Sequence, residues 1–124
     1  MSEVDRNRRR EATVLFKLGV KANKAGVHRT LNRSPQGKGW VQCVNSPAGI
    51  MCRPEKVREA IEHFSRAYQT FPDILALNQI ALGYDMLGEL EPARQHFQRM
   101  REQARAENVP AYVQAAELGL ARVK

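Results

Sequence analysis

The chain has 124 residues, of which 43% are hydrophobic and 27% charged, and this composition predicts one globular domain with a modest core rather than a disordered chain. No apolar run approaches the ~18 residues of a membrane span, and the first ten residues lack the apolar segment of a secretory signal, so we expect a cytoplasmic protein without a membrane partner. The net charge of +7 is uneven, since residues 1–58 hold 13 Lys and Arg against 4 Asp and Glu, whereas residues 59–124 hold 7 against 9. This asymmetry favours an anionic partner for the first half, a head-to-tail contact between copies, or a solvated basic surface.

The N-terminal part begins with charged residues and continues as an amphipathic pattern. We assign residues 1–10 to a basic arm, which can also form the first turns of a helix, and residues 11–124 to a single domain. Apolar residues at spacings of three and four predict a helix from Glu11 to Gly26. Its expected buried face comprises Ala12, Leu15, Leu18, Gly19 and Ala22.

Residues 28–53 interrupt the helical pattern. The stretch is rich in Gly, Pro, Ser and Asn and contains no Asp or Glu. It predicts an inserted loop, in which weak alternation over 39–44 and 50–52 allows a short β-hairpin. Loops of this length inside a compact domain are usually functional or disordered.

Four helices with clear start and stop signals are expected after the insertion. Pro54 suits the first turn of a helix that ends at Phe71, and Asp73 caps a second helix that runs to Gly88. A third helix is expected from Pro92 and a last one from Pro110 to the C-terminal end.

A repeat links two of these helices. Ala60, Phe64 and Ala67 recur 33 residues later as Ala93, Phe97 and Met100. A period near this length is typical of a helical solenoid, in which a helix pair cannot bury its apolar face alone and stacks on its neighbour. The predicted fold class is therefore all-α.

In these positions the chain resembles the tetratricopeptide repeat (TPR) family, whose unit of 34 residues is a helix-turn-helix. The residues that carry the resemblance in the second unit are Leu77, Ile80, Ala81, Tyr84, Gly88, Ala93, Phe97 and Met100. Those of the first unit are Leu15, Leu18, Gly19, Ala22, Gly26, Ala60, Phe64, Ala67 and Pro72. The resemblance implies two stacked helical hairpins, the first split by the insertion at 28–53, with the helix from Pro110 as a closing cap. Met100 and Arg105 depart from the small residue and the proline that the family favours at these places.

The same resemblance implies a concave groove that holds a peptide or a protein segment. The residues expected to face it are Thr13, Phe16, Val20, Asn23, Lys24, Leu75, Asn78, Leu82, Asp85 and Met86. Phe16 and Val20 stand where the chaperone-binding members of the family have Lys and Asn, so we do not expect that specificity. A mainly apolar groove suits an extended or helical peptide. The alternative is that the insertion or a second copy of the chain covers these residues, because stacks of this kind usually need three or more units.

The sequence therefore predicts a non-catalytic adaptor, scaffold or chaperone-like module without a cofactor, whose partner is a protein or a peptide and which can also form a homo-oligomer. The alternative function is a small basic protein that binds nucleic acid through its N-terminal helix and the insertion, with Trp40 stacking on a base. Residues expected to make contacts from the insertion are Arg29, Arg33, Lys38 and Trp40. For the insertion we favour a different hypothesis, in which it folds back over the groove with Trp40 as its hydrophobic anchor.

Two cysteines, Cys43 and Cys52, lie nine residues apart in the insertion. They can form a disulfide across a hairpin, or a metal site with His28 and His63, but their spacing matches no paired zinc-binding pattern. Because we expect a cytoplasmic protein, two free thiols are the favoured interpretation and no metal is expected. His63 and His96 are both interpreted as solvated residues on polar helix faces. No grouping of Ser, His and an acid indicates an enzyme.

Overall fold

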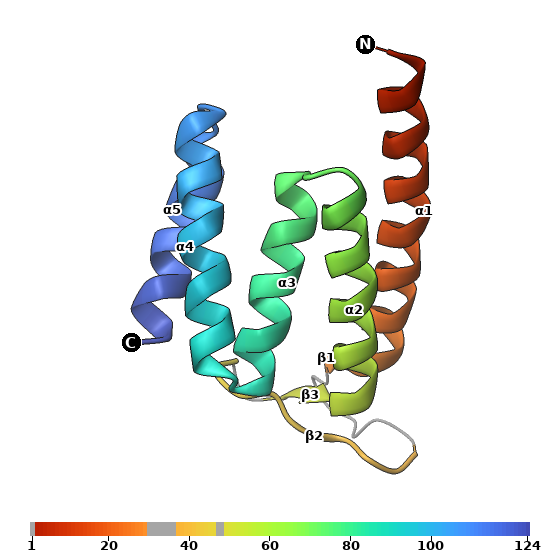
Figure 1. Ribbon diagram of the computed structural model, residues 1–124. Helices are drawn as coiled ribbons and strands as arrows, with labels where there is room; N and C mark the ends of the chain where they lie inside the picture. Colours follow the sequence, from red (N-terminus) through yellow and green to blue (C-terminus); the bar gives the residue numbers. More distant parts are fainter. Residues whose placement is uncertain (1, 30–36, 47–48) are drawn as a thin grey trace.

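The computed structural model describes residues 2–29, 37–46 and 49–124 and shows a mainly helical chain with a small sheet. The helices are α1 (Glu3–Gly26), α2 (Pro54–Thr70), α3 (Ile74–Leu87), α4 (Leu90–Ala106) and α5 (Pro110–Arg122). The strands are β1 (Val27–Arg29), β2 (Val41–Gln42) and β3 (Ile50–Cys52). Each helix packs against the next along the chain, so that the five lie side by side with the sheet at one end (Figure 1).

The helix boundaries follow local signals in the sequence. Asp73 caps α3 by accepting a hydrogen bond from the Leu75 amide at 2.9 Å, and Gly88 ends the helix in the left-handed conformation with φ 76°. Residues 3–10, for which we allowed either a basic arm or the first turns of a helix, are helical, with the Ser2 side chain accepting from the Asp5 amide. One helix start differs from expectation, because α4 begins at Leu90, two residues before Pro92.

Helix α1 packs on α2 through small residues. The residues of α1 that are buried are Ala12, Gly19, Ala22 and Gly26. A Cβ atom on Gly19 would lie 2.6 Å from the Phe64 ring, so the glycine allows a close helix contact. The prediction that Leu18 is buried is wrong, because its side chain is 42% exposed. Successive helical residues lie about 100° apart, and the contact with α2 is centred on Gly19 rather than on its neighbour.

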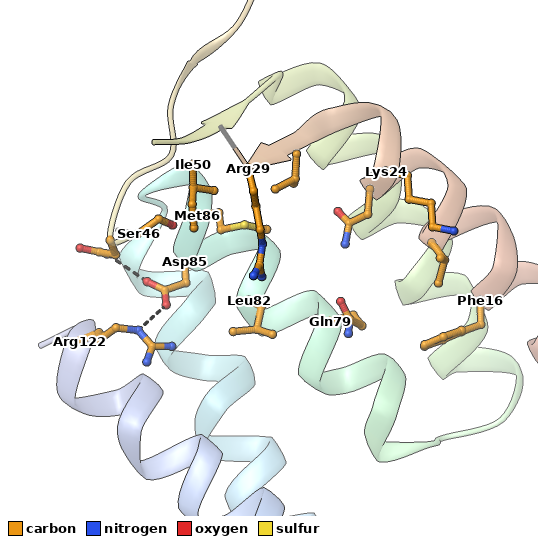
Figure 2. A pocket seen from close by; sticks show the side chains of 14 residues that line it. Phe16, Lys24, Arg29, Ser46, Ile50, Gln79, Leu82, Asp85, Met86 and Arg122 are labelled. Carbon is orange, nitrogen blue, oxygen red and sulfur yellow. Dashed lines mark hydrogen bonds and ion pairs between the residues drawn. The ribbon is translucent and has the colours of Figure 1, made fainter. Parts of the chain in front are cut away.

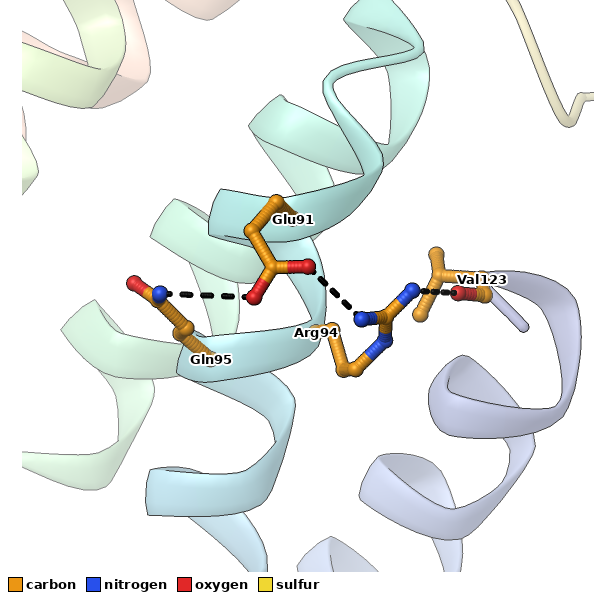
Figure 3. Close-up of polar contacts among 4 residues, drawn as sticks. All are labelled: Glu91, Arg94, Gln95 and Val123. Atoms are coloured by element: carbon orange, nitrogen blue, oxygen red, sulfur yellow. Dashed lines mark hydrogen bonds and ion pairs between the residues drawn. The ribbon is translucent and has the colours of Figure 1, made fainter.

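The core consists of two clusters that meet along α3. The larger side chains of one come from α3, from α4 and from the residue directly after α5: Leu77, Phe97, Met100 and Val123. Those of the other come from α2, α3 and the insertion: Cys43, Cys52, Val57, Ile61, Phe64 and Ile80. Figure 3 shows polar contacts at the edge of the first cluster. The Arg94 guanidinium donates to Glu91 at 2.6 Å and to the Val123 carbonyl at 3.3 Å. This contact fixes the end of α5 against α4.

The insertion forms an antiparallel three-stranded sheet in the order β1-β3-β2. The predicted hairpin is present as β2 paired with β3, and the sequence analysis missed β1, which pairs Val27 with Cys52. The Arg53 amide donates to the Gly26 carbonyl at 2.8 Å. The two ends of the insertion are thereby held together, and α1 and α2 pack as neighbours despite their separation in the sequence.

Cys43 and Cys52 form a disulfide, so the prediction of two free thiols is wrong. The pairing of β2 with β3 brings the two Cα atoms to 5.2 Å, which lies within the range that a disulfide spans. Both residues are buried against α2, at 2% and 1% exposure. The insertion is therefore a cross-linked part of the core at one end of the helices.

Candidate functional site

A cavity of about 710 Å³ lies between α1 and α3, and residues of the insertion and of α5 also line it. We call it the α1–α3 groove. Figure 2 shows side chains from all of these elements around it. Its lining consists of Phe16, Val20, Asn23, Lys24, Val27, Arg29, Asn45, Ser46, Ile50, Gln79, Leu82, Asp85, Met86 and Arg122.

Seven of the ten residues predicted for the groove line this cavity: Phe16, Val20, Asn23, Lys24, Leu82, Asp85 and Met86. Thr13 and Leu75 line a separate pocket of about 150 Å³ between α1, α2 and α3, which Phe16 also borders. Asn78 is half-buried and borders neither of these two pockets. The repeat pattern therefore predicts the groove residues from Phe16 onward on α1 and from Leu82 onward on α3, and it misplaces Thr13, Leu75 and Asn78.

The groove has an apolar floor. Phe16 stands edge-on to the buried Phe64 ring, with centroids 5.0 Å apart, which holds its position on α1. Val20, also on α1, lines the groove, and Leu82 and Met86 are half-buried side chains of α3 that line it too. These four side chains therefore provide a hydrophobic surface inside the groove.

Asp85 connects three elements at the end of the groove. It is 3% exposed, and its Oδ1 accepts from the Asn45 amide group at 3.0 Å. Its Oδ2 accepts from Arg122 Nε at 2.9 Å (Figure 2). The Val44 amide also donates to the Met86 carbonyl at 2.8 Å. Asp85 was predicted as a contact residue for a ligand, but the structure gives its carboxylate a structural role that joins α3 to the insertion and α5.

Of the predicted contact residues of the insertion that the structure describes, one borders the groove. Arg29 borders the groove and its guanidinium points into the cavity (Figure 2). Lys38 is exposed and does not line the groove. Arg33 lies outside the described residues. Trp40 does not line the groove either, so the hypothesis that it anchors the insertion there is wrong.

Trp40 instead packs on the outer side of the sheet. The Arg53 guanidinium lies 4.6 Å from its ring centroid, and the His28 ring lies at 5.9 Å. Side chains alternate between the two faces of a strand, so consecutive residues of β1 contact different parts of the protein. His28 contacts Trp40, whereas Arg29 borders the groove.

The sequence patterns did not indicate six of the lining residues: Val27, Asn45, Ser46, Ile50, Gln79 and Arg122. One signal could have found Arg122. Alternate helices of a stack of hairpins share a face, so α5 should border the same groove as α1 and α3. No local pattern indicates Asn45, because its partner Asp85 is 40 residues away in the sequence.

We expected His96 to be solvated on a polar helix face, but it is half-buried. Its ring lies 5.4 Å from that of Tyr84, and Nδ1 is 2.7 Å from the Pro92 carbonyl. Burial lowers the pKa of His96, and the contact with Pro92 offsets part of this effect. The residue lies outside the groove.

Two further features bear on the expected classes of function. Over the described ranges, His, Cys, Asp and Glu side chains do not gather in groups of three or more that could hold a metal ion. No helix in the described part of the chain has the length and apolar character of a membrane span.

Comparison with known proteins gives no relative for this chain. No protein-family model, no curated protein and no solved structure matches it. The groove and its chemistry are therefore the basis for assigning a function.

Proposed function

We propose that the chain is a non-catalytic, TPR-like adaptor that binds a segment of a partner protein in the α1–α3 groove. The observation that carries this proposal is the cavity of about 710 Å³ bordered by seven of the ten residues expected from the repeat pattern. Pockets that hold ligands are mostly apolar, with a few polar groups that fix orientation. Phe16, Val20, Leu82 and Met86 supply the apolar surface, and Asn23 and Gln79 supply amide groups.

The arrangement of the helices supports a TPR-like stack. Helices α1, α3 and α5 all contribute side chains to the groove, while α2 and α4 contribute none. This alternation is what stacked helical hairpins produce, because the first helix of each pair faces one side. In this proposal α5 is the closing cap, and Ala116 of α5 and Val123 directly after it are buried in the same cluster as Phe97 and Met100 of α4.

A non-catalytic role agrees with the residues of the groove. Among the residues that the structure describes, the groove lining includes no His and no Cys, which are common bases and nucleophiles in enzymes. Its buried carboxylate, Asp85, already accepts hydrogen bonds from Asn45 and Arg122 on its two oxygens.

The expected cytoplasmic location stays a prediction. Disulfides are uncommon in the cytoplasm, although the two cysteines here are buried and therefore shielded from thiol reductants. The redox state of Cys43 and Cys52 in the native cell is the observation that bears on the location most directly.

Capture of partners by the tagged protein, with identification by mass spectrometry, tests the proposal. The groove variant is Leu82→Asn, and its matched control is Leu118→Asn on α5, whose side chain is 58% exposed and does not line the groove. We expect the control and the parent to capture the same protein and the groove variant to lose it. Equal capture by both variants would show that the groove is not the binding surface.

A further inference from the structure

The groove carries an excess of positive charge. Its charged lining residues are Lys24, Arg29, Arg122 and Asp85. The 2.9 Å ion pair between Arg122 and Asp85 neutralises one cation. Within the described part of the chain, Lys24 of α1 and Arg29 of β1, the strand that directly follows α1, have no carboxylate within ion-pair distance.

Arg29 differs from Arg58, Arg94, Arg105 and Arg122, each of which lies within ion-pair distance of a carboxylate. Arg58 pairs with Glu89, and Arg105 lies 3.5 Å from Glu117. Within the described ranges, no carboxylate lies within ion-pair distance of Arg29, although its side chain points into the cavity (Figure 2). A guanidinium is always charged and can donate to both oxygens of a carboxylate.

The backbone of Arg29 is fixed before any ligand arrives. Strand β1 pairs Arg29 with Ile50 of β3, and the disulfide holds β3 to the segment that follows β2. At the other end of the strand, Val27 pairs with Cys52 directly after α1. Less conformational freedom is therefore lost when Arg29 binds a ligand than if it stood on a flexible loop.

We propose that the α1–α3 groove selects an acidic peptide segment, in which a carboxylate side chain binds Arg29 and apolar side chains contact Leu82 and Met86. This inference rests on the proposed function and adds the chemistry of the partner. Charge complementarity favours an acidic segment over a basic one. A basic segment would be repelled by Lys24 and Arg29, whereas an acidic segment would neutralise both charges.

The test is selection of random twelve-residue peptides, displayed on phage, against the immobilised parent protein. It is repeated with Arg29→Glu and with Lys38→Glu, an exposed residue of the same insertion that does not line the groove. Both substitutions change the net charge equally, so any difference between them reflects position. Circular dichroism checks that both variants keep the helical content of the parent.

We expect peptides selected by the parent and by Lys38→Glu to be enriched in Asp and Glu beside apolar residues, and those selected by Arg29→Glu to lose this acidic excess. A synthetic peptide from the parent selection should bind Arg29→Glu about tenfold more weakly, which corresponds to about 1.4 kcal/mol, and should bind Lys38→Glu as it binds the parent.

The two proposals fail in different ways. If selected peptides bind the parent and lose affinity with Leu82→Asn, but show no acidic excess or keep it with Arg29→Glu, the groove binds peptides and the acidic preference is wrong. If no peptide is selected, or if Leu82→Asn has no effect on those that are, the proposed function fails as well. A dimer of the parent that Arg29→Glu dissociates would identify a second copy as the occupant, which also overturns the inference.

Discussion

Arg122 and Asp85 meet across 37 residues of sequence, with Arg122 Nε donating to Asp85 Oδ2 at 2.9 Å. The Asp85 side chain is 4% exposed, whereas that of Arg122 is 40% exposed. Asn45 occupies the other carboxylate oxygen at 3.0 Å. One buried carboxylate therefore links α3, α5 and the inserted segment at the end of the groove.

We predict that Asp85→Ala destabilises the protein by about 1–3 kcal/mol, because it leaves two donors without their acceptor in a part-buried site. Urea denaturation followed by circular dichroism measures the change. The matched control is Glu117→Ala, which removes an ion pair whose side chains are 53% and 59% exposed. Such exposed pairs contribute about 0–1 kcal/mol. Equal losses in the two variants would mean that the Asp85 network does not stabilise the fold.

We predict that Phe64→Ala and Phe97→Ala each lower the free energy of unfolding by about 3–5 kcal/mol, because each leaves a cavity at a site that is 1% exposed. Phe64 packs against Gly19 of α1 and Phe97 against Gly119 of α5, so each ring joins two helices. Thermal and urea denaturation measure the effect. Leu118→Ala, at an exposed position, is the control and should stay within about 0.5 kcal/mol of the parent. Parent-like melting of both phenylalanine variants would disprove the role of the repeat in the core.

The helices were predictable because their signals are local. Pro54, Asp73, Gly88 and Pro110 mark boundaries within a residue of those observed. Strand β1 was not predictable, because it has three residues, directly continues α1 and is defined by pairing with a strand more than 20 residues away. Such pairing depends on the path of the insertion and leaves no periodic pattern.

The disulfide was missed for a different reason. Its geometry follows from the pairing of β2 with β3, which the sequence allowed, but the expected compartment favoured free thiols. In the groove, the helical repeat located Phe16, Val20, Leu82 and their neighbours. It could not locate Arg122, whose role depends on how α5 packs, and it could not reveal that Asp85 is bound by other residues of the protein.

We predict that the double variant Cys43→Ala/Cys52→Ala is less stable by about 2–3 kcal/mol, the loop-closure entropy expected for a ring of this size. Urea denaturation of the parent with and without a strong thiol reductant provides the control. Since both treatments open the same cross-link, the reduced parent and the variant should unfold at similar urea concentrations. A variant as stable as the oxidised parent would show that the bond adds nothing to stability.

We predict that the protein loses stability as the pH falls from 7 to 5, with a contribution from His96. Burial lowers the pKa of His96 in the folded state, with nearby Arg99 acting in the same direction. The unfolded chain therefore binds the proton more readily, and the stability contributed by the neutral ring, present at neutral pH, is lost as the pH falls below the ordinary histidine pKa of about 6.5. His96→Gln should flatten the dependence of the urea midpoint on pH. Identical pH curves for the parent and His96→Gln would contradict this assignment.

Chemical-shift mapping by NMR tests the central claim, that the α1–α3 groove binds a peptide segment, most directly. The labelled protein is titrated with a peptide selected against it. We predict that the largest backbone changes fall at Val20, Arg29, Leu82 and Met86, which border the groove. Changes concentrated instead on the outer faces of α2 and α4, at exposed residues such as Glu62 and Gln98, would contradict the account.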